Sequence, residues 1–75
     1  MERFILTSTI YHMEKELVFY GIALIKETRG AYELIKAIND ISENKRRVQA
    51  LVDDCNKSKF SEEQLLISVD AFAYK

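Results

Sequence analysis

Apolar and polar residues alternate with a period of two through the first part of the chain, which is the spacing of side chains along a β-strand. Residues 3–11, RFILTSTIY, are rich in β-branched and aromatic residues and predict a strand. Residues 16–27, ELVFYGIALIKE, predict a second, longer strand. The polar residues HMEK at 12–15 lie between them, so the pattern predicts a β-hairpin.

The segment that follows the second strand has two interpretations. Residues 28–30, TRG, predict a turn, because Gly30 can adopt a positive φ. The apolar positions of residues 31–41, AYELIKAINDI, fit either a helical stripe or one face of a strand. We favour a third strand, because a two-stranded hairpin is only marginally stable by itself. A short helix is the alternative.

Beyond residue 41 the apolar spacing becomes helical. Ser42 is the expected N-cap of a first helix, with Glu43 in the first turn, where the helix dipole favours a carboxylate. Asn56 and the KSK that follows it end this helix. Its apolar stripe consists of Val48, Leu51, Val52 and Cys55.

A second helix has a clear start in the sequence. Ser61 and Gln64 form an S-x-x-Q capping box, and Phe60 can pack onto Leu65 as a hydrophobic staple. The apolar stripe of this helix consists of Leu65, Leu66, Val69, Phe72 and Ala73. The chain is therefore expected to be one α+β domain over residues 1–75: an antiparallel β-meander of two to three strands in 1–41, and an αα-hairpin in 42–75 that packs on one sheet face.

Pairing Tyr11 with Glu16 in the hairpin assigns each side chain of the first two strands to a face. The expected core face carries Phe4, Leu6, Ser8, Ile10, Leu17, Phe19, Gly21, Ala23 and Ile25. The opposite face carries Ile5, Thr7, Thr9, Tyr11, Glu16, Val18, Tyr20, Ile22 and Leu24. This second face has too many aliphatic residues for a surface that only contacts water.

Two helices on the core face would leave the second face uncovered. Monomeric proteins rarely expose a contiguous apolar patch, so we expect this face to bind another protein. A two-fold homodimer would bury it, and a different protein partner would do so equally well. The expected interface consists of Ile5, Thr7, Val18, Tyr20, Ile22 and Leu24.

Length and composition support self-association. A chain of 75 residues buries a small core and usually needs a disulfide, a metal or a partner chain. One Cys and one His supply neither an internal disulfide nor a four-ligand zinc site. The lone thiol and the lack of a secretory or membrane-spanning pattern favour a reducing cytoplasm and no membrane partner.

One basic cluster offers an alternative function. Lys45, Arg46 and Arg47 could contact an anion and make the protein a nucleic-acid-associated regulator. The net charge is −1, however, and the second helix begins with Glu62 and Glu63, which phosphate would repel. A solvated helix face is therefore the more common explanation of the cluster, and nucleic-acid binding is the alternative.

No catalytic arrangement is visible in the sequence. Cys55 completes an apolar stripe, and the sole histidine, His12, lies in the predicted hairpin turn, so a buried structural thiol is expected. Neighbouring carboxylates on a helix point about 100° apart and do not form a shared acid–base site. We expect no enzyme activity, no cofactor and no metal.

Three segments carry a family resemblance: YGI at 20–22, NDISENKRRVQALVDDCN at 39–56 and FSEEQLLISVDAF at 60–72. Together they resemble a family of small uncharacterised proteins from Gram-positive anaerobic bacteria, in which a D-I-S before a helix and an acidic-hydrophobic closing helix recur. The resemblance implies a bacterial cytoplasmic setting and a β-then-α order. It supplies no active residues, because the family is a domain of unknown function.

Overall fold

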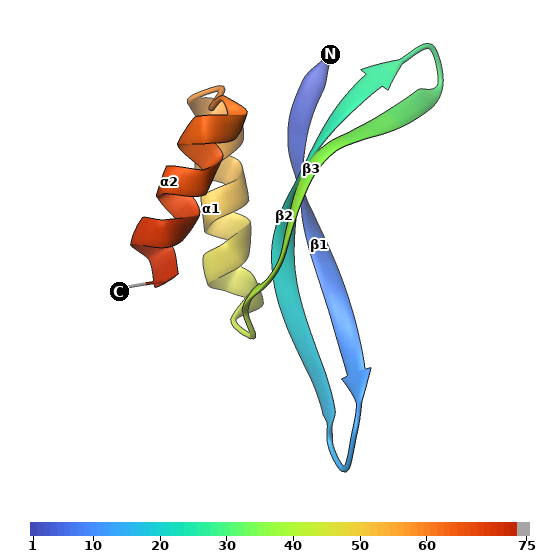
Figure 1. Ribbon diagram of the computed structural model, residues 1–75, viewed down its shortest axis with the longest axis vertical. Helices are drawn as coiled ribbons and strands as arrows, with labels where there is room; N and C mark the ends of the chain where they lie inside the picture. The colour runs from blue at the N-terminus through green and yellow to red at the C-terminus, as the bar shows by residue number, and fades with distance from the viewer. Residues whose placement is uncertain (74–75) are drawn as a thin grey trace.

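The computed structural model describes residues 1–73, and the side chains of residues 1–72. Its sheet contains β1 (Glu2–His12), β2 (Glu16–Thr28) and β3 (Ala31–Ser42), which are antiparallel neighbours in that order. The helices are α1 (Lys45–Lys57) and α2 (Glu62–Ala73). Both helices lie on the same side of the sheet (Figure 1). The predicted α+β meander is confirmed, and residues 31–42 form a strand rather than a helix.

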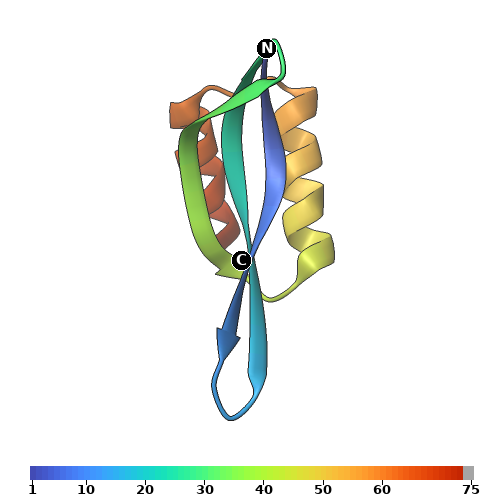
Figure 2. The ribbon, with the colours of Figure 1, turned by 90° about the vertical axis from the view of Figure 1, so that its right-hand side faces the viewer.

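The core lies between the sheet and the two helices. It consists of Phe4, Ile22, Leu24, Val48, Val52, Cys55 and Leu65. α1 contacts all three strands, whereas α2 contacts β3, so the two helices lie over different parts of the sheet (Figure 2). The predicted stripe of α1 is confirmed, because Val48, Val52 and Cys55 are buried and Leu51 packs against them.

The predicted hairpin register is wrong by one residue. His12 pairs with Glu16, and Tyr11 pairs with Leu17, so the connection has three residues, 13–15, instead of four. Side chains alternate between the faces of a strand, so this shift moves every β2 side chain to the other face relative to β1. Ile22 and Leu24, expected on the uncovered face, are 0% and 3% exposed in the core beneath the helices.

β3 bends sharply where it passes Gly21. Tyr20 pairs with Ser42 and Ile22 pairs with Ile38, so residues 39–41 of β3 lie opposite Gly21 alone. Within this bulge Asp40 has a φ of 56°, in the left-handed region. The two residues of the β2–β3 turn, Arg29 and Gly30, also have positive φ values, 34° and 81°, as the twist of a tight hairpin favours.

The N-cap of α1 is Asn44, which corrects the expectation of Ser42. The Asn44 side chain accepts a hydrogen bond from the Arg47 amide at 3.1 Å, whereas Ser42 is the last residue of β3. The Ser42 hydroxyl instead accepts a bond from the Asn44 amide at 3.0 Å, which holds the chain between strand and helix. Glu43 therefore precedes α1, and no acidic residue occupies its first turn.

The connection between the helices follows from local hydrogen bonds. The Phe60 amide donates to the Cys55 carbonyl at 3.1 Å, and Lys59 has a φ of 49°, so α1 ends in a Schellman motif. The predicted capping box of α2 is confirmed: the Gln64 amide donates to Ser61 Oγ, and the Ser61 amide donates to Gln64 Oε1.

The apolar stripe of α2 is narrower than predicted. Leu65 is buried, and Val69 and Phe72 pack against the core. Leu66 is exposed, which corrects its assignment to the stripe. The predicted role of the Ala73 side chain lies outside the described residues.

The β1–β2 hairpin extends beyond the rest of the domain as a two-stranded arm (Figure 1). The last residue of β3 pairs with Tyr20, so within residues 1–73 only β1 pairs with residues 16–19 of β2. Apolar side chains on this arm are exposed, including Ile10, Tyr11 and Met13. The arm therefore carries apolar surface that neither helix covers.

Candidate interaction surface

The sheet has a second face that neither helix covers, which we call the open face (Figures 1 and 2). The pairing registers place on it Arg3, Ile5, Thr7, Thr9 and Tyr11 of β1, Leu17, Phe19, Gly21, Ala23, Ile25 and Glu27 of β2, and Tyr32, Leu34 and Ala37 of β3. Ala23 and Ile25 on the central strand are buried by their neighbours, whereas Tyr32 and Leu34 are 62% and 63% exposed.

The open face is nearly free of charge. Its two charged side chains in this set, Arg3 and Glu27, lie at one end and face each other with Nε and Oε2 3.9 Å apart. Between this pair and the arm, the surface presents Ile5, Leu34 and Phe19 together with threonine hydroxyls. The open face is therefore an apolar surface bordered by one exposed ion pair.

The structure divides the predicted interface residues between the two faces. Ile5 and Thr7 lie on the open face and are half-buried. Val18 and Tyr20 share the helix-facing side with Ile22 and Leu24, and Tyr20 packs against the core, which corrects their assignment to the uncovered face. The physical reason is the one-residue register shift at the hairpin turn.

Sequence reasoning missed several open-face residues for the same reason. The predicted register places Leu17 and Phe19 on the core face, and the sequence pattern assigns Leu34 to no face of the sheet. The adjacent residue in β3, Ile35, packs against the core because a register shift lies between Leu34 and Lys36. A three-residue loop is a common hairpin connection, and pairing the strands around a loop of that length would have placed these residues on the open face.

A hydrogen bond joins the arm to the bulge of β3. The Tyr11 hydroxyl donates to Asp40 Oδ2, and the Tyr11 ring packs edge-on against Phe19 with centroids 5.8 Å apart. This hydrogen bond to Asp40 raises the pKa of the Tyr11 phenol, and desolvation and the Asp40 charge act in the same direction. These contacts hold β1, β2 and β3 together at the end of the open face next to the arm.

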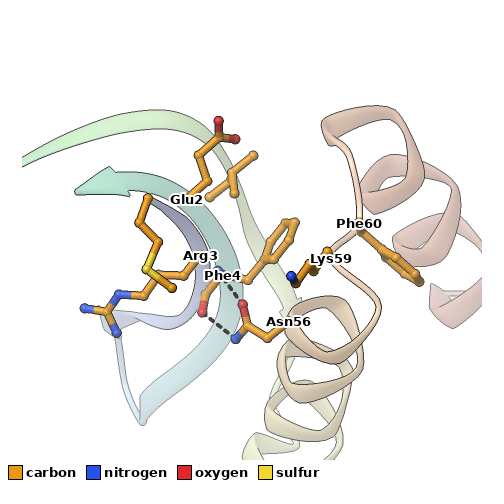
Figure 3. A pocket seen from close by; sticks show the side chains of 8 residues that line it. Glu2, Arg3, Phe4, Asn56, Lys59 and Phe60 are labelled. Carbon is orange, nitrogen blue, oxygen red and sulfur yellow. Dashed lines mark hydrogen bonds between the residues drawn. The ribbon is translucent and has the colours of Figure 1, made fainter. Parts of the chain in front are cut away.

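Asn56 covers part of the outer edge of β1 (Figure 3). Its Oδ1 accepts a hydrogen bond from the Phe4 amide at 2.8 Å, and its Nδ2 donates to the Phe4 carbonyl at 2.9 Å. The side-chain amide thus takes the place of a neighbouring strand for one residue. α1 is attached to the sheet edge at this point as well as through the core.

A pocket of about 530 Å³ lies beside this contact. Its lining consists of Met1, Glu2, Arg3, Phe4, Leu24, Asn56, Lys59 and Phe60 (Figure 3). Every buried side-chain nitrogen or oxygen among the described residues has a hydrogen-bond partner, so no unsatisfied polar group points to a ligand here. The pocket is an open hollow between the sheet edge and the end of α1.

The structure separates the members of the predicted anion-contact cluster. The Arg47 guanidinium lies 4.6 Å from the ring centroid of Phe72 on α2, which is a cation–π contact between the helices. Lys45 and Arg46 border a shallow hollow on α1 together with Asp53. Glu43 precedes α1, so it is not part of the helix that carries Arg47. Nucleic-acid binding stays a prediction, which steeply salt-dependent binding to DNA or RNA would support.

Cys55 and His12 lie in different parts of the fold. Cys55 is fully buried in the core, and burial together with the Asp54 charge raises the pKa of its thiol. His12 ends β1 at the arm, with Nδ1 3.8 Å from Glu16 Oε2. Within the described part of the chain, no three His, Cys, Asp or Glu side chains are grouped to hold a metal. Neither α1 nor α2 is long and apolar enough to cross a membrane.

Comparison with known proteins places the chain in a family. Residues 2–70 match the model of a family described as "Family of unknown function (DUF6514)". No curated protein and no solved structure matches the chain.

Proposed function

Because the chain belongs to this family of unknown function, we propose a role from the geometry: a small, non-catalytic interaction module of the bacterial cytoplasm that self-associates through the open face. The observation that supports the proposal is the uncovered apolar side of the sheet, on which Leu34 is 63% exposed and Tyr32 is 62% exposed. Antiparallel sheets that contact water usually place polar residues on their second face. A contiguous apolar surface of this kind is typical of a binding site for another protein.

A second copy of the chain fits this surface. Arg3 and Glu27, the charged side chains that the registers place on the open face, pair with each other within one copy, so two such faces can meet without leaving either charge unpaired. A two-fold arrangement places the same patch on both sides of the interface. Each copy would then cover the apolar residues of the other, and the small core would gain the support that a chain of this size needs.

Substitution of Leu34 tests the proposal. We expect Leu34→Lys to lower the molar mass in light scattering, because the new charge would lie in the open-face interface. Ile67→Lys is a matched control, since Ile67 is also 63% exposed but lies on α2. Equal loss of association in both variants would show that the charge acts through solubility, and unchanged association of Leu34→Lys would contradict the proposal.

A further inference from the structure

The backbone of β1 alternates between its two edges. Met1 and Glu27 exchange both backbone hydrogen bonds, at 2.8 and 2.9 Å, so they form a hydrogen-bonded pair. In an antiparallel ladder such pairs alternate with pairs whose N–H and C=O groups point outward. The odd-numbered residues of β1 therefore bond to β2, and the even-numbered residues direct their backbone groups to the outer edge.

Only part of this outer edge has a partner. The outward groups of Phe4 are bound by the side chain of Asn56. Those of Leu6, Ser8 and Ile10 have no hydrogen-bond partner among the described residues. The edge from 6 to 10 contains no proline, charged residue or bulge, which are the features that protect exposed strand edges in proteins.

The opposite edge of the sheet is protected. β3 has two irregularities in its register with β2, and Asp40 has a positive φ. It also carries charged residues at Glu33 and Lys36. These features discourage pairing with another strand. The outer edge of β1 is therefore better suited than that of β3 to pair with a strand from another chain.

The side chains of this segment are symmetric about Ser8. Reading outward from Ser8, Thr7 matches Thr9 and Leu6 matches Ile10. We propose that residues 6–10 pair antiparallel with the same residues of a second copy, around a two-fold axis at Ser8. Leu6 then lies opposite Ile10 of the other copy, and Thr7 opposite Thr9, so each cross-strand pair joins residues of like chemistry.

This pairing has consequences for the whole assembly. Two three-stranded sheets join into one continuous sheet, and each outward N–H and C=O of Leu6, Ser8 and Ile10 gains a partner. The two-fold axis is perpendicular to the sheet, so the helices of both copies lie on one side of the joined sheet. The two open faces lie next to each other on its other side and form one continuous surface. The inference goes beyond the proposed function, because it uses the sheet edge and does not require contact between open faces.

Charge substitutions at Ser8 test the position of the axis. Ser8 is exposed, so Lys or Glu can replace it without entering the core. We expect Ser8→Lys and Ser8→Glu each to weaken dimerisation roughly fivefold or more. The reason is that residue 8 of each copy then lies opposite the same charge on residue 8 of the other copy. A mixture of the two variants should form the heterodimer at low salt. Homodimers as strong as those of the unmodified chain, or no preference for the heterodimer, would overturn the proposal.

A disulfide test gives an independent readout. Directly opposed residues in a hydrogen-bonded pair have Cα atoms about 5.5 Å apart, within the range of a disulfide. We expect the Ser8→Cys variant to form a covalent dimer under mild oxidation, and Ser58→Cys, at an exposed position after α1, to do so much more slowly. Equal rates for both variants would overturn the pairing.

The two surfaces can be separated by combining variants. If Leu34→Lys abolishes association through the open face, the Ser8→Cys/Leu34→Lys double variant should still cross-link. Cross-linking that disappears with Leu34→Lys would show that the edge does not pair by itself and would overturn this inference without affecting the proposed function. If cross-linking is retained and Leu34→Lys leaves the molar mass in light scattering unchanged, the result would support pairing along the edge of β1 and contradict the open-face proposal.

Discussion

The carbonyl oxygen of Ile38 lies 2.3 Å from the position that a Cβ atom on Gly21 would occupy. The Thr7 hydroxyl and the Asn39 Cα are 2.9 and 3.0 Å from the same position. The backbone of β3 can therefore lie this close to β2 only because residue 21 has no side chain. The bulge in β3 and the close approach at Gly21 are two parts of one local arrangement.

Gly21→Ala should destabilise the fold. The added methyl group would collide with backbone atoms, which cannot move aside as a flexible side chain can, and we expect a loss of about 1–3 kcal/mol in the free energy of unfolding. Urea denaturation followed by circular dichroism measures this loss. Gly30→Asn is the control, because a Cβ at Gly30 meets nothing within 4 Å and Asn tolerates its positive φ. Equal losses in both variants would contradict the steric account.

Asn56→Ala should weaken the attachment of α1 to the sheet edge. The substitution leaves the amide and carbonyl of Phe4 without their partner, and we expect a cost of about 1–3 kcal/mol. Thermal and urea denaturation test this expectation. Lys57→Ala is a suitable control, because Lys57 is the exposed neighbour of Asn56 in the same helical turn. A variant as stable as the unmodified chain would show that water replaces both bonds at no cost.

Asp40→Asn should lower the pKa of the Tyr11 phenol towards its ordinary value. The Asp40 carboxylate accepts a hydrogen bond from the neutral phenol and repels the phenolate, so its charge opposes ionisation. A titration of phenolate absorbance measures the change, and the difference from Tyr11→Phe isolates the Tyr11 component. A Tyr11 transition that is the same with and without Asp40 would contradict this contact.

The Cys55 thiol should react slowly in the folded protein. It is fully buried, and burial raises its pKa, so little thiolate is present or accessible. Ellman's reagent should modify it only as fast as the protein opens, and rapidly in denaturant. Rapid reaction of the folded protein would contradict the buried position.

The raised pKa of Cys55 also predicts a loss of stability in alkali. Because the pKa is higher in the folded state, its contribution to stability is fully present below the unfolded pKa and is lost as the pH rises through the folded pKa. Unfolding free energies measured through this alkaline range should fall less steeply for Cys55→Ala than for the unmodified chain. Parallel pH profiles would show that Cys55 does not contribute to the loss.

Local patterns in the sequence predicted most of the elements. The period-two spacing identified the first two strands, and the marginal stability of a lone hairpin favoured the third. The reciprocal bonds of Ser61 and Gln64 match the predicted capping box. The buried side of α1 followed from the spacing of Val48, Val52 and Cys55. These features depend on residues within a few positions of one another, so the sequence contains the information directly.

The faces of the sheet were harder to predict, because they depend on a single residue in a turn. HMEK is equally compatible with a four-residue loop and with a shorter loop in which His12 pairs with Glu16. With the longer loop, Ile22 and Leu24 are assigned to the open face and Phe19 to the core face, which is the reverse of the faces they occupy. Similarly, Ser42 and Asn44 are both good N-caps, and the strand pairing of Ser42 with Tyr20 leaves Asn44 as the cap.

The molar mass of the full chain as a function of concentration is the most direct test of the central claim, that the uncovered side of the sheet joins two copies. Sedimentation equilibrium should show reversible self-association of the unmodified chain and of Ile67→Lys, and a lower average molar mass for Leu34→Lys at the same concentration. A single monomeric species at all workable concentrations of the unmodified chain would contradict the claim.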